Sequence, residues 1–122
     1  MKTSDAGDRW EVRLYVTPEE RTPVLEFLVG LPVRHRAKVR QAVGRLEVFG
    51  PNLGFPDTSA VKDAPFRELR TRFAGQQYRI LYLQDSAAFV LFTGFHKTSD
   101  RDLDRALREA KTYLTDYRAR RG

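Results

Sequence analysis

The chain has 122 residues, and we expect one domain over residues 1–122 with a hydrophobic core of its own. It contains no cysteine, which excludes disulfides and thiolate metal sites and fits a reducing compartment. No apolar stretch is long enough to cross a membrane, and the N-terminus lacks the apolar segment of a signal peptide. We therefore expect a cytoplasmic protein with no membrane partner.

The charge balance is the most informative bulk property. Twenty-two Lys and Arg residues against 16 Asp and Glu residues give a formal net charge of +6. A small basic domain of this kind either binds a polyanion, most commonly nucleic acid, or carries the excess charge only for solubility. Composition leaves both explanations open.

The first part of the chain has the pattern of a strand followed by two helices. Residues 10–16 alternate in hydrophobicity, as in a strand with one buried face. A Thr-Pro pair then starts a helix that ends near Gly30, and a second helix follows Pro32. The apolar positions of the second helix form one stripe: Val39, Ala42, Val43, Leu46 and Phe49. The short connection predicts an antiparallel helical hairpin.

A long loop and three strands come next. The loop spans residues 50–64, and segments of this length are functional or mobile in compact domains. Strands are predicted over residues 66–73, 77–84 and 87–96, joined by tight turns. The last of them is apolar on both faces, which indicates a central strand.

The chain ends in an amphipathic helix. Its apolar stripe runs from Leu103 to Tyr117, and Ser99 with Asp102 forms a capping box at its start. Residues 1–9 and 118–122 are expected to be flexible. The predicted fold class is α+β: an antiparallel β-sheet meander with an N-terminal strand, an α-helical hairpin on one face and a C-terminal helix.

Four motifs occur in order along nearly the whole chain: FGPNLG (49–54), ELR (68–70), YRILY (78–82) and GFHKT (94–98). Together they resemble the RelE/HigB-type toxins, in particular the phage-derived branch of the RelE/ParE toxin–antitoxin superfamily. The resemblance implies an endoribonuclease without metal or other cofactor that cleaves mRNA, typically in the decoding site of the 30S ribosomal subunit. It also implies a cognate antitoxin, often a helix-turn-helix protein. ParE-like relatives share the fold but inhibit DNA gyrase.

Metal-independent RNA cleavage requires three kinds of group. A base removes the proton of the ribose 2′-OH, cations stabilise the charge on the phosphorus centre, and an acid protonates the leaving 5′-oxygen. The products are a 2′,3′-cyclic phosphate and a 5′-hydroxyl. Arginine suits the second task because its fork binds two phosphate oxygens and stays charged.

Strand alternation sorts the basic residues of the predicted sheet by face. If Leu69 faces the helical hairpin, Arg70 and Arg72 face the opposite side. The same reasoning turns Arg79 away from the core. Both sets then meet on the uncovered face of the meander, and we expect His96 to join them at the rim.

These positions define the predicted catalytic residues. Arg70 and Arg79 hold the scissile phosphate, and they match basic positions on the sheet of the toxin family. His96 acts as general base or acid, because a histidine side chain ordinarily has a pKa of about 6.5, which allows either role at neutral pH. Lys97 binds phosphate or assists. His96 and Lys97 match a family segment near the RNA-binding cleft.

Six further basic residues are predicted to contact RNA: Arg34, Arg36, Lys38, Lys62, Arg67 and Arg72. Structural explanations compete with the functional ones. Arg70 and Arg72 would be solvated residues paired with Glu68, and His96 would be a polar strand end or a cap near the last helix.

Other polar and aromatic residues have simpler explanations. His35 is predicted to be a surface residue. Tyr113 and Tyr117 follow the apolar stripe of the last helix and are predicted to pack in the core. No metal-ligand spacing stands out, so no metal site is predicted. Besides the endoribonuclease, two functions stay open: a gyrase inhibitor, and a family member that binds RNA or antitoxin without cleaving.

Overall fold

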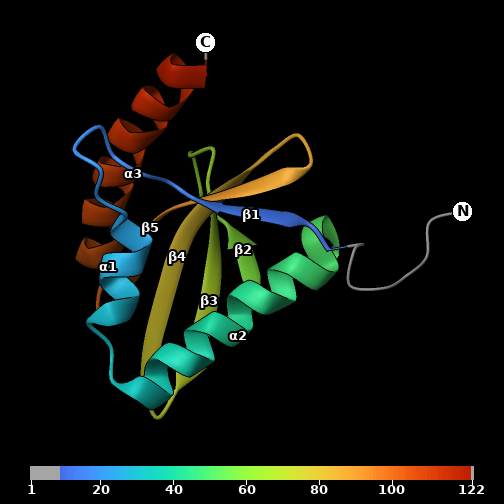
Figure 1. The fold of residues 1–122 in the computed structure, drawn as a ribbon. Coiled ribbons are helices and arrows are strands. Elements are labelled where there is room, and N and C mark those ends of the chain that lie inside the picture. Colours follow the sequence, from blue (N-terminus) through green and yellow to red (C-terminus); the bar gives the residue numbers. More distant parts are fainter. Residues whose placement is uncertain (1–8, 122) are drawn as a thin grey trace, which may run out of the picture.

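The computed structural model of the chain describes residues 9–121. The elements along the chain are β1 (Glu11–Leu14), α1 (Pro23–Val29), α2 (Val33–Phe49), the 3-10 helix η2 (Gly50–Asn52), β2 (Thr58–Ala60), β3 (Arg67–Phe73), β4 (Gln76–Asp85), β5 (Ala88–His96) and α3 (Asp100–Arg121) (Figure 1). Of the segments predicted to be flexible, residues 1–8 and 122 lie outside the described part. Residues 118–121 continue α3.

The five strands form one mixed sheet in the order β1-β5-β4-β3-β2. The predicted meander is confirmed, because β3, β4 and β5 pair antiparallel in sequence. β1 adds to the sheet by pairing in parallel with β5, which makes β5 an inner strand as its two apolar faces predicted. The α+β fold class is therefore confirmed.

The segment predicted to be a loop contains secondary structure. η2 and β2 lie within residues 50–64, and β2 pairs with the first half of β3. Thr58 anchors β2 to β4: the residue is fully buried, and its hydroxyl lies 2.6 Å from the hydroxyl of Tyr82. A three-residue strand is too short to produce a period-two pattern, so the prediction was wrong here.

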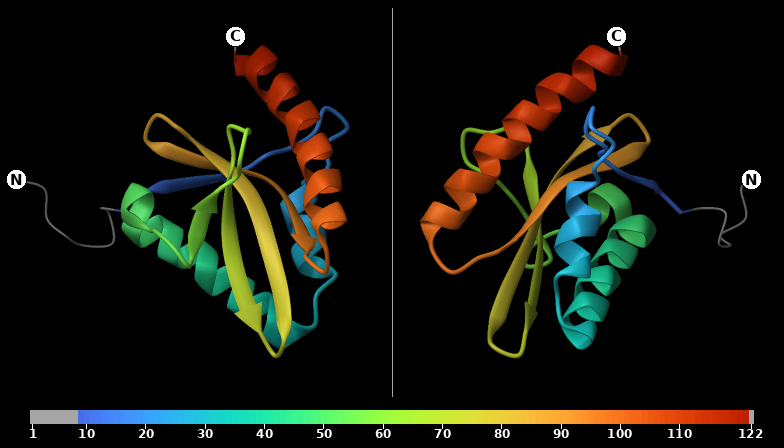
Figure 2. Two further views of the ribbon diagram at one scale, coloured as in Figure 1. Left: turned by 180° about the vertical axis from the view of Figure 1, so that it is seen from behind. Right: turned by 60° about the vertical axis from the view of Figure 1, so that its left-hand side comes forward.

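Helices cover both faces of the sheet (Figure 2). The core between the sheet and the α1/α2 hairpin contains Val24, Val39, Leu46, Leu69, Ile80 and Leu91. The core between the sheet and α3 contains Phe66, Leu81, Val90, Phe92, Ala106 and Ala110. The prediction that the second face is open was therefore wrong. The stripe on α3 indicates that the helix packs, but it does not indicate on which face of the sheet.

The buried stripe of α2 ends before Phe49. Val39, Ala42 and Leu46 are buried as predicted, but Phe49 is half exposed. Trp10 fills the space at this end of the helix: a Cβ at Gly50 would lie only 2.4 Å from its indole nitrogen. Gly50 also has a φ of +53°, so the chain turns off the helix at a residue where only glycine fits without strain.

Candidate nucleic-acid interface

A cleft of about 580 Å³ lies beside β3, beyond the point where β2 stops pairing with it. It is lined by residues of α2, of the segment before β2, and of β3 and β4: Lys38, Gln41, Arg45, Phe55, Pro56, Asp57, Arg70, Thr71, Arg72, Gln77 and Arg79. The cleft exists because β2 is short, so that most of β3 has no strand partner on its outer side. Phe55, Pro56 and Asp57, in the segment before β2, complete the lining.

The lining of the cleft is strongly cationic. Five of its residues carry a positive charge, namely Lys38, Arg45, Arg70, Arg72 and Arg79, and one carries a negative charge, Asp57. Asp57 lies 3.6 Å from Arg45, so its charge is shared with that arginine. A concave surface with this excess of cations concentrates positive potential and attracts a polyanion.

Arg79 is held at the base of the cleft by two side chains. Its Nη1 donates to Glu68 Oε1 at 2.9 Å and its Nη2 donates to Gln77 Oε1 at 2.7 Å. Arg79 and Glu68 are each only 6% exposed. Burial lowers the pKa of Arg79, and the attraction of Glu68 opposes that shift, so the guanidinium keeps its charge. Two of its five N–H groups make these bonds, which leaves donors for a ligand.

Arg70 lies directly opposite Arg79 on the neighbouring strand. Both side chains lie on the face opposite Leu69 and Ile80, as alternation predicted. Two like charges facing each other across a strand pair destabilise the sheet unless an anion lies between them. Glu68 neutralises one of the two, and a bound phosphate would neutralise the other. The pairing therefore favours an anion in the cleft.

His96 does not share the face of Arg79. Phe95 pairs with Arg79, and His96 pairs with Tyr78 on the α1/α2 side. The prediction was wrong because β5 contains a bulge: Leu81 pairs with Thr93 but Tyr82 pairs with Leu91, which leaves Phe92 as an extra residue. An extra residue reverses the faces of every residue after it.

Lys97 is the residue after His96, so by strand alternation it belongs to the opposite face of the sheet. Its backbone N–H donates to the carbonyl of Gln77 at 2.8 Å and so prolongs the strand ladder by one residue. Its ammonium lies 3.8 Å from Asp100, at the start of α3. Neither His96 nor Lys97 lines the cleft.

His35 was predicted to be a surface residue, but it is partly buried in an aromatic cluster with Phe73 and Tyr78. Its Nδ1 lies 2.7 Å from the hydroxyl of Tyr78, and its ring packs edge-on against Phe73 at 5.0 Å between centroids. The ring of His96 lies 5.2 Å from Tyr78 on the same side. The signal was present in the sequence, because His35 precedes the buried Val39 by one helical turn.

The cleft lies within a segment that matches a known family. Residues 26–115 match the family described as "Phage derived protein Gp49-like (DUF891)". The chain belongs to this family. Gp49 is a HigB-like toxin, and the family is part of the RelE/ParE-like toxin superfamily. The match includes every residue that lines the cleft. No curated protein matches the chain significantly.

In this Gp49-like chain, three of the predicted RNA-binding residues lie at or near the cleft. Lys38 and Arg72 line it. Arg34 is one helical turn from Lys38, and both cations lie over the ring of Phe73, at 6.0 and 5.3 Å. α2 thus presents Arg34 and Lys38 toward Phe73, the last residue of β3.

The other three predicted RNA-binding residues lie elsewhere. Arg36 donates to the carbonyls of Leu28 and Leu31, so its guanidinium closes the C-terminal end of α1. Arg67 donates to the hydroxyl of Thr58 at 3.2 Å, and Lys62 is exposed between β2 and β3.

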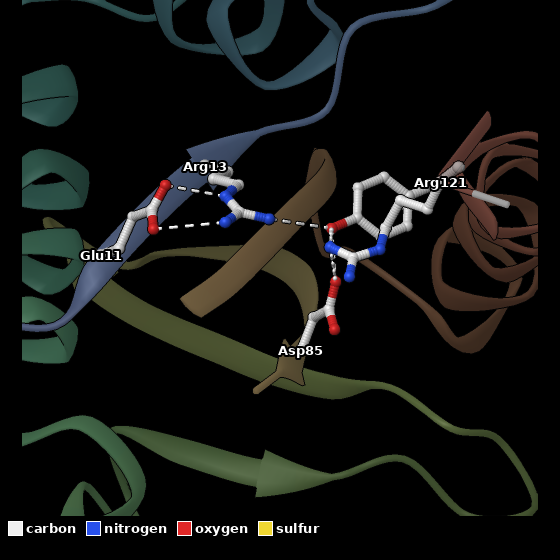
Figure 3. Close-up of polar contacts among 5 residues, drawn as sticks. Glu11, Arg13, Asp85 and Arg121 are labelled. Carbon is white, nitrogen blue, oxygen red and sulfur yellow. Dashed lines mark hydrogen bonds and ion pairs between the residues drawn. The ribbon is translucent and has the colours of Figure 1, made fainter. Parts of the chain in front are cut away.

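Tyr113 and Tyr117 pack in the α3 core as predicted. Tyr117 also belongs to a polar network at the other end of β4 (Figure 3). Its hydroxyl donates to Asp85 at 2.6 Å and accepts from Arg13 and Arg121, each at 3.3 Å. Burial raises the pKa of Tyr113. Neither tyrosine lines the cleft.

Residues 9–121 contain no group of three or more His, Asp or Glu side chains placed to hold a metal ion. None of the helices described is both long and apolar enough to span a membrane.

Proposed function

We propose that this protein is the toxin of a type II toxin–antitoxin system and acts as a metal-independent endoribonuclease that cleaves mRNA on the ribosome. The observation that carries the proposal is the facing pair Arg70 and Arg79 in a cleft with five cations and one carboxylate. Membership of the Gp49-like family supports the toxin part of the proposal.

The arginines of the cleft supply transition-state stabilisation. In 2′-OH attack, negative charge grows on the non-bridging oxygens of the phosphate. Arg79 is held in one orientation by Glu68 and Gln77, so it meets that charge without reorganising. Arg70 approaches from the neighbouring strand and Arg72 adds a third cation. Attack then yields a 2′,3′-cyclic phosphate and a 5′-hydroxyl.

Proton transfer is the role proposed for His96, with Lys97 assisting. His96 is exposed at the end of β5, on the side where Tyr78 and His35 lie. The 2′-OH is adjacent to the phosphorus that it attacks, so this role requires the scissile phosphate to lie at the β3–β4 end of the sheet, within reach of both the cleft arginines and His96. Replacing His96 by Ala therefore tests the path of the RNA as well as the role: wild-type cleavage by the variant would exclude the histidine.

The cognate antitoxin is the second partner. An acidic or amphipathic segment of the antitoxin that covers the cationic cleft would block RNA and complement its charge. This part of the proposal predicts that RNA and antitoxin compete, which a displacement assay with labelled RNA measures.

The function is tested by inducing the chain from a tight promoter and mapping RNA 5′ ends soon after induction. New 5′-hydroxyl ends inside translated codons are expected. DNA damage without RNA cleavage would instead indicate a gyrase inhibitor, and normal growth with antitoxin binding would indicate a family member that has lost cleavage.

A further inference from the structure

Phe55 stands at the rim of the cleft with its ring in solvent. It is 77% exposed, the highest value among the exposed large hydrophobic side chains of the described chain. The segment that carries it is anchored on both sides: Thr58 N–H donates to Gly54 O at 3.1 Å, and Arg70 N–H donates to Asp57 O at 2.8 Å. The ring is therefore presented by a fixed backbone and contributes little to either core.

The surroundings of Phe55 define the ligand that its ring suits. The guanidinium of Arg70 lies 5.3 Å from the ring centroid, so one side chain offers a π-face and its neighbour offers a phosphate-binding fork. A nucleotide combines the matching pair of groups, a planar base and a phosphate. Recognition of single-stranded RNA commonly uses bases stacked on aromatic side chains.

The remaining exposed apolar side chains differ from Phe55 in this respect. Val29 and Val33 are 64% and 74% exposed at the connection between α1 and α2, and both are aliphatic. Neither lines the cationic cleft. Among these exposed side chains, Phe55 alone combines an aromatic face with the cations of the cleft.

We propose that Phe55 is a stacking platform for one base of the single-stranded RNA bound in the cleft, while Arg70 contacts the phosphate of the same nucleotide. This inference rests on the proposed function only in taking RNA as the ligand of the cleft. Stacking tolerates any base, since every base has a π-face. Phe55 thus adds affinity and sets the position of the strand without selecting a sequence.

The test uses an RNA that the protein cannot cleave: a short single strand with 2′-O-methyl riboses. A series of such strands carries one abasic nucleotide at each position in turn. Dissociation constants are measured by fluorescence anisotropy at several salt concentrations for wild type, Phe55→Ala and Phe55→Trp. Phe49→Ala is the matched control, because it removes a half-exposed phenyl ring outside the cleft.

Phe55→Ala is expected to weaken binding by about five- to a hundred-fold, the range for loss of one aromatic stacking partner. Phe55→Trp retains affinity and Phe49→Ala leaves it unchanged. The salt dependence keeps its slope in Phe55→Ala, since no charge is lost. One abasic position weakens binding to wild type, and that same position has no effect in Phe55→Ala.

Equal affinity of wild type and Phe55→Ala for the intact strand would overturn the inference, as would an abasic effect that persists in the variant. Loss of antitoxin binding with unchanged RNA binding would assign the ring to the protein partner and would also overturn it. Cleavage is scored separately on unmodified RNA. Binding that depends on Phe55 without cleavage refutes the endoribonuclease alone, and cleavage without that dependence refutes the stacking role alone.

Discussion

Arginines lie near both ends of β4, but their ion-pair partners differ between the two ends. At the β1–α3 end, Arg13 bonds Glu11 and Arg121 bonds Asp85, at 2.7 and 2.6 Å (Figure 3). At the cleft end, Arg79 is the arginine with a buried carboxylate partner. Arg70 and Arg72 make no ion pair within residues 9–121. The same residue type therefore ties α3 to the sheet at one end and is left available for an anion at the other.

The difference shows how a structural arginine is told from a functional one in a basic domain. Net charge does not separate them, since both ends contribute to the excess. Ion pairing does separate them, because an arginine with a carboxylate within hydrogen-bond distance already has its charge neutralised. Arg79 belongs to both groups: it is paired with Glu68 and it lines the cleft. Its partner fixes its direction while its remaining donors stay open.

The largest effect is expected from Arg79→Lys. Lysine keeps a positive charge beside Glu68 but loses the fork, so RNA cleavage should fall by about 100-fold or more. The measurement is the rate of cleavage in a translation extract. Arg121→Lys is the matched change at the β1–α3 end, and it should leave the rate within a factor of two or so. Equal losses in both variants would mean that the two ends do not differ in function.

The buried pair at the cleft end should dominate stability. Glu68→Gln leaves the Arg79 charge without its counter-ion, and we expect the free energy of unfolding to fall by about 3 kcal/mol. Asp85→Asn removes a carboxylate at the more exposed β1–α3 end and should cost no more than about 1 kcal/mol. Urea titration measures both.

A double replacement separates stability from cleavage at the same pair. Glu68→Leu with Arg79→Met removes both charges and should recover most of the stability lost in Glu68→Gln. It should remain inactive on RNA. A variant that recovers stability and also cleaves would show that Arg79 is structural only.

The β1–α3 end should be sensitive to alkali. Tyr15 is buried and donates to Asp116 at 2.6 Å, and burial, with the Asp116 charge, raises the pKa of Tyr15 to about 12. The unfolded tyrosine ionises near its ordinary value of about 10. Raising the pH from 10 to 12 therefore favours the unfolded chain, and the stabilisation is lost through that window.

Tyr15→Phe isolates this contribution. The phenylalanine variant should lose less stability than wild type between pH 10 and 12, by up to about 2 kcal/mol. Thermal melting followed by circular dichroism gives the comparison. Parallel curves for the two proteins would exclude Tyr15 as the source of the alkaline sensitivity, and RNA cleavage at neutral pH should be the same in both.

The smallest effect expected is a change in salt dependence. Arg72 is exposed in the cleft and without a partner ion in the described chain, so Arg72→Ala should reduce the slope of log affinity against log salt by about 0.7 for a single strand. Arg121→Ala should leave the slope unchanged because Arg121 pairs with Asp85. If the slope fell by the same amount in both variants, RNA would contact both ends of the sheet.

The sequence predicted best the features that repeat over many residues. The apolar stripes predicted α2 and α3. The alternation along β3 and β4 predicted these strands and placed Arg70 and Arg79 on one face. Both predictions succeeded because helix and strand periods are local properties. The failures depend on single residues or on tertiary contacts. Neither the three-residue β2 nor the side of the sheet that α3 covers has a local signature.

His96 is the clearest case of a site residue that periodicity misplaced. Its face depends on the extra residue Phe92 in β5, four positions earlier. A bulge is set by pairing with β4, and nothing in the apolar run around Phe92 marks it. Phe55 was overlooked for a related reason, since an aromatic residue in a loop gives no sign of its exposure until the neighbouring strand is in place.

The parallel pairing of β1 with β5 also has a consequence for biosynthesis. β1 is made before β5, yet it cannot dock until Ala88–His96 has left the ribosomal tunnel. Trp10 and Val12 of this early segment pack into the α1/α2 core, so that core closes late as well. Contacts between residues so far apart in sequence slow folding. The residues of β1 should therefore stay unpaired while α1 to β4 are made, and the sheet should be completed only once β5 is available.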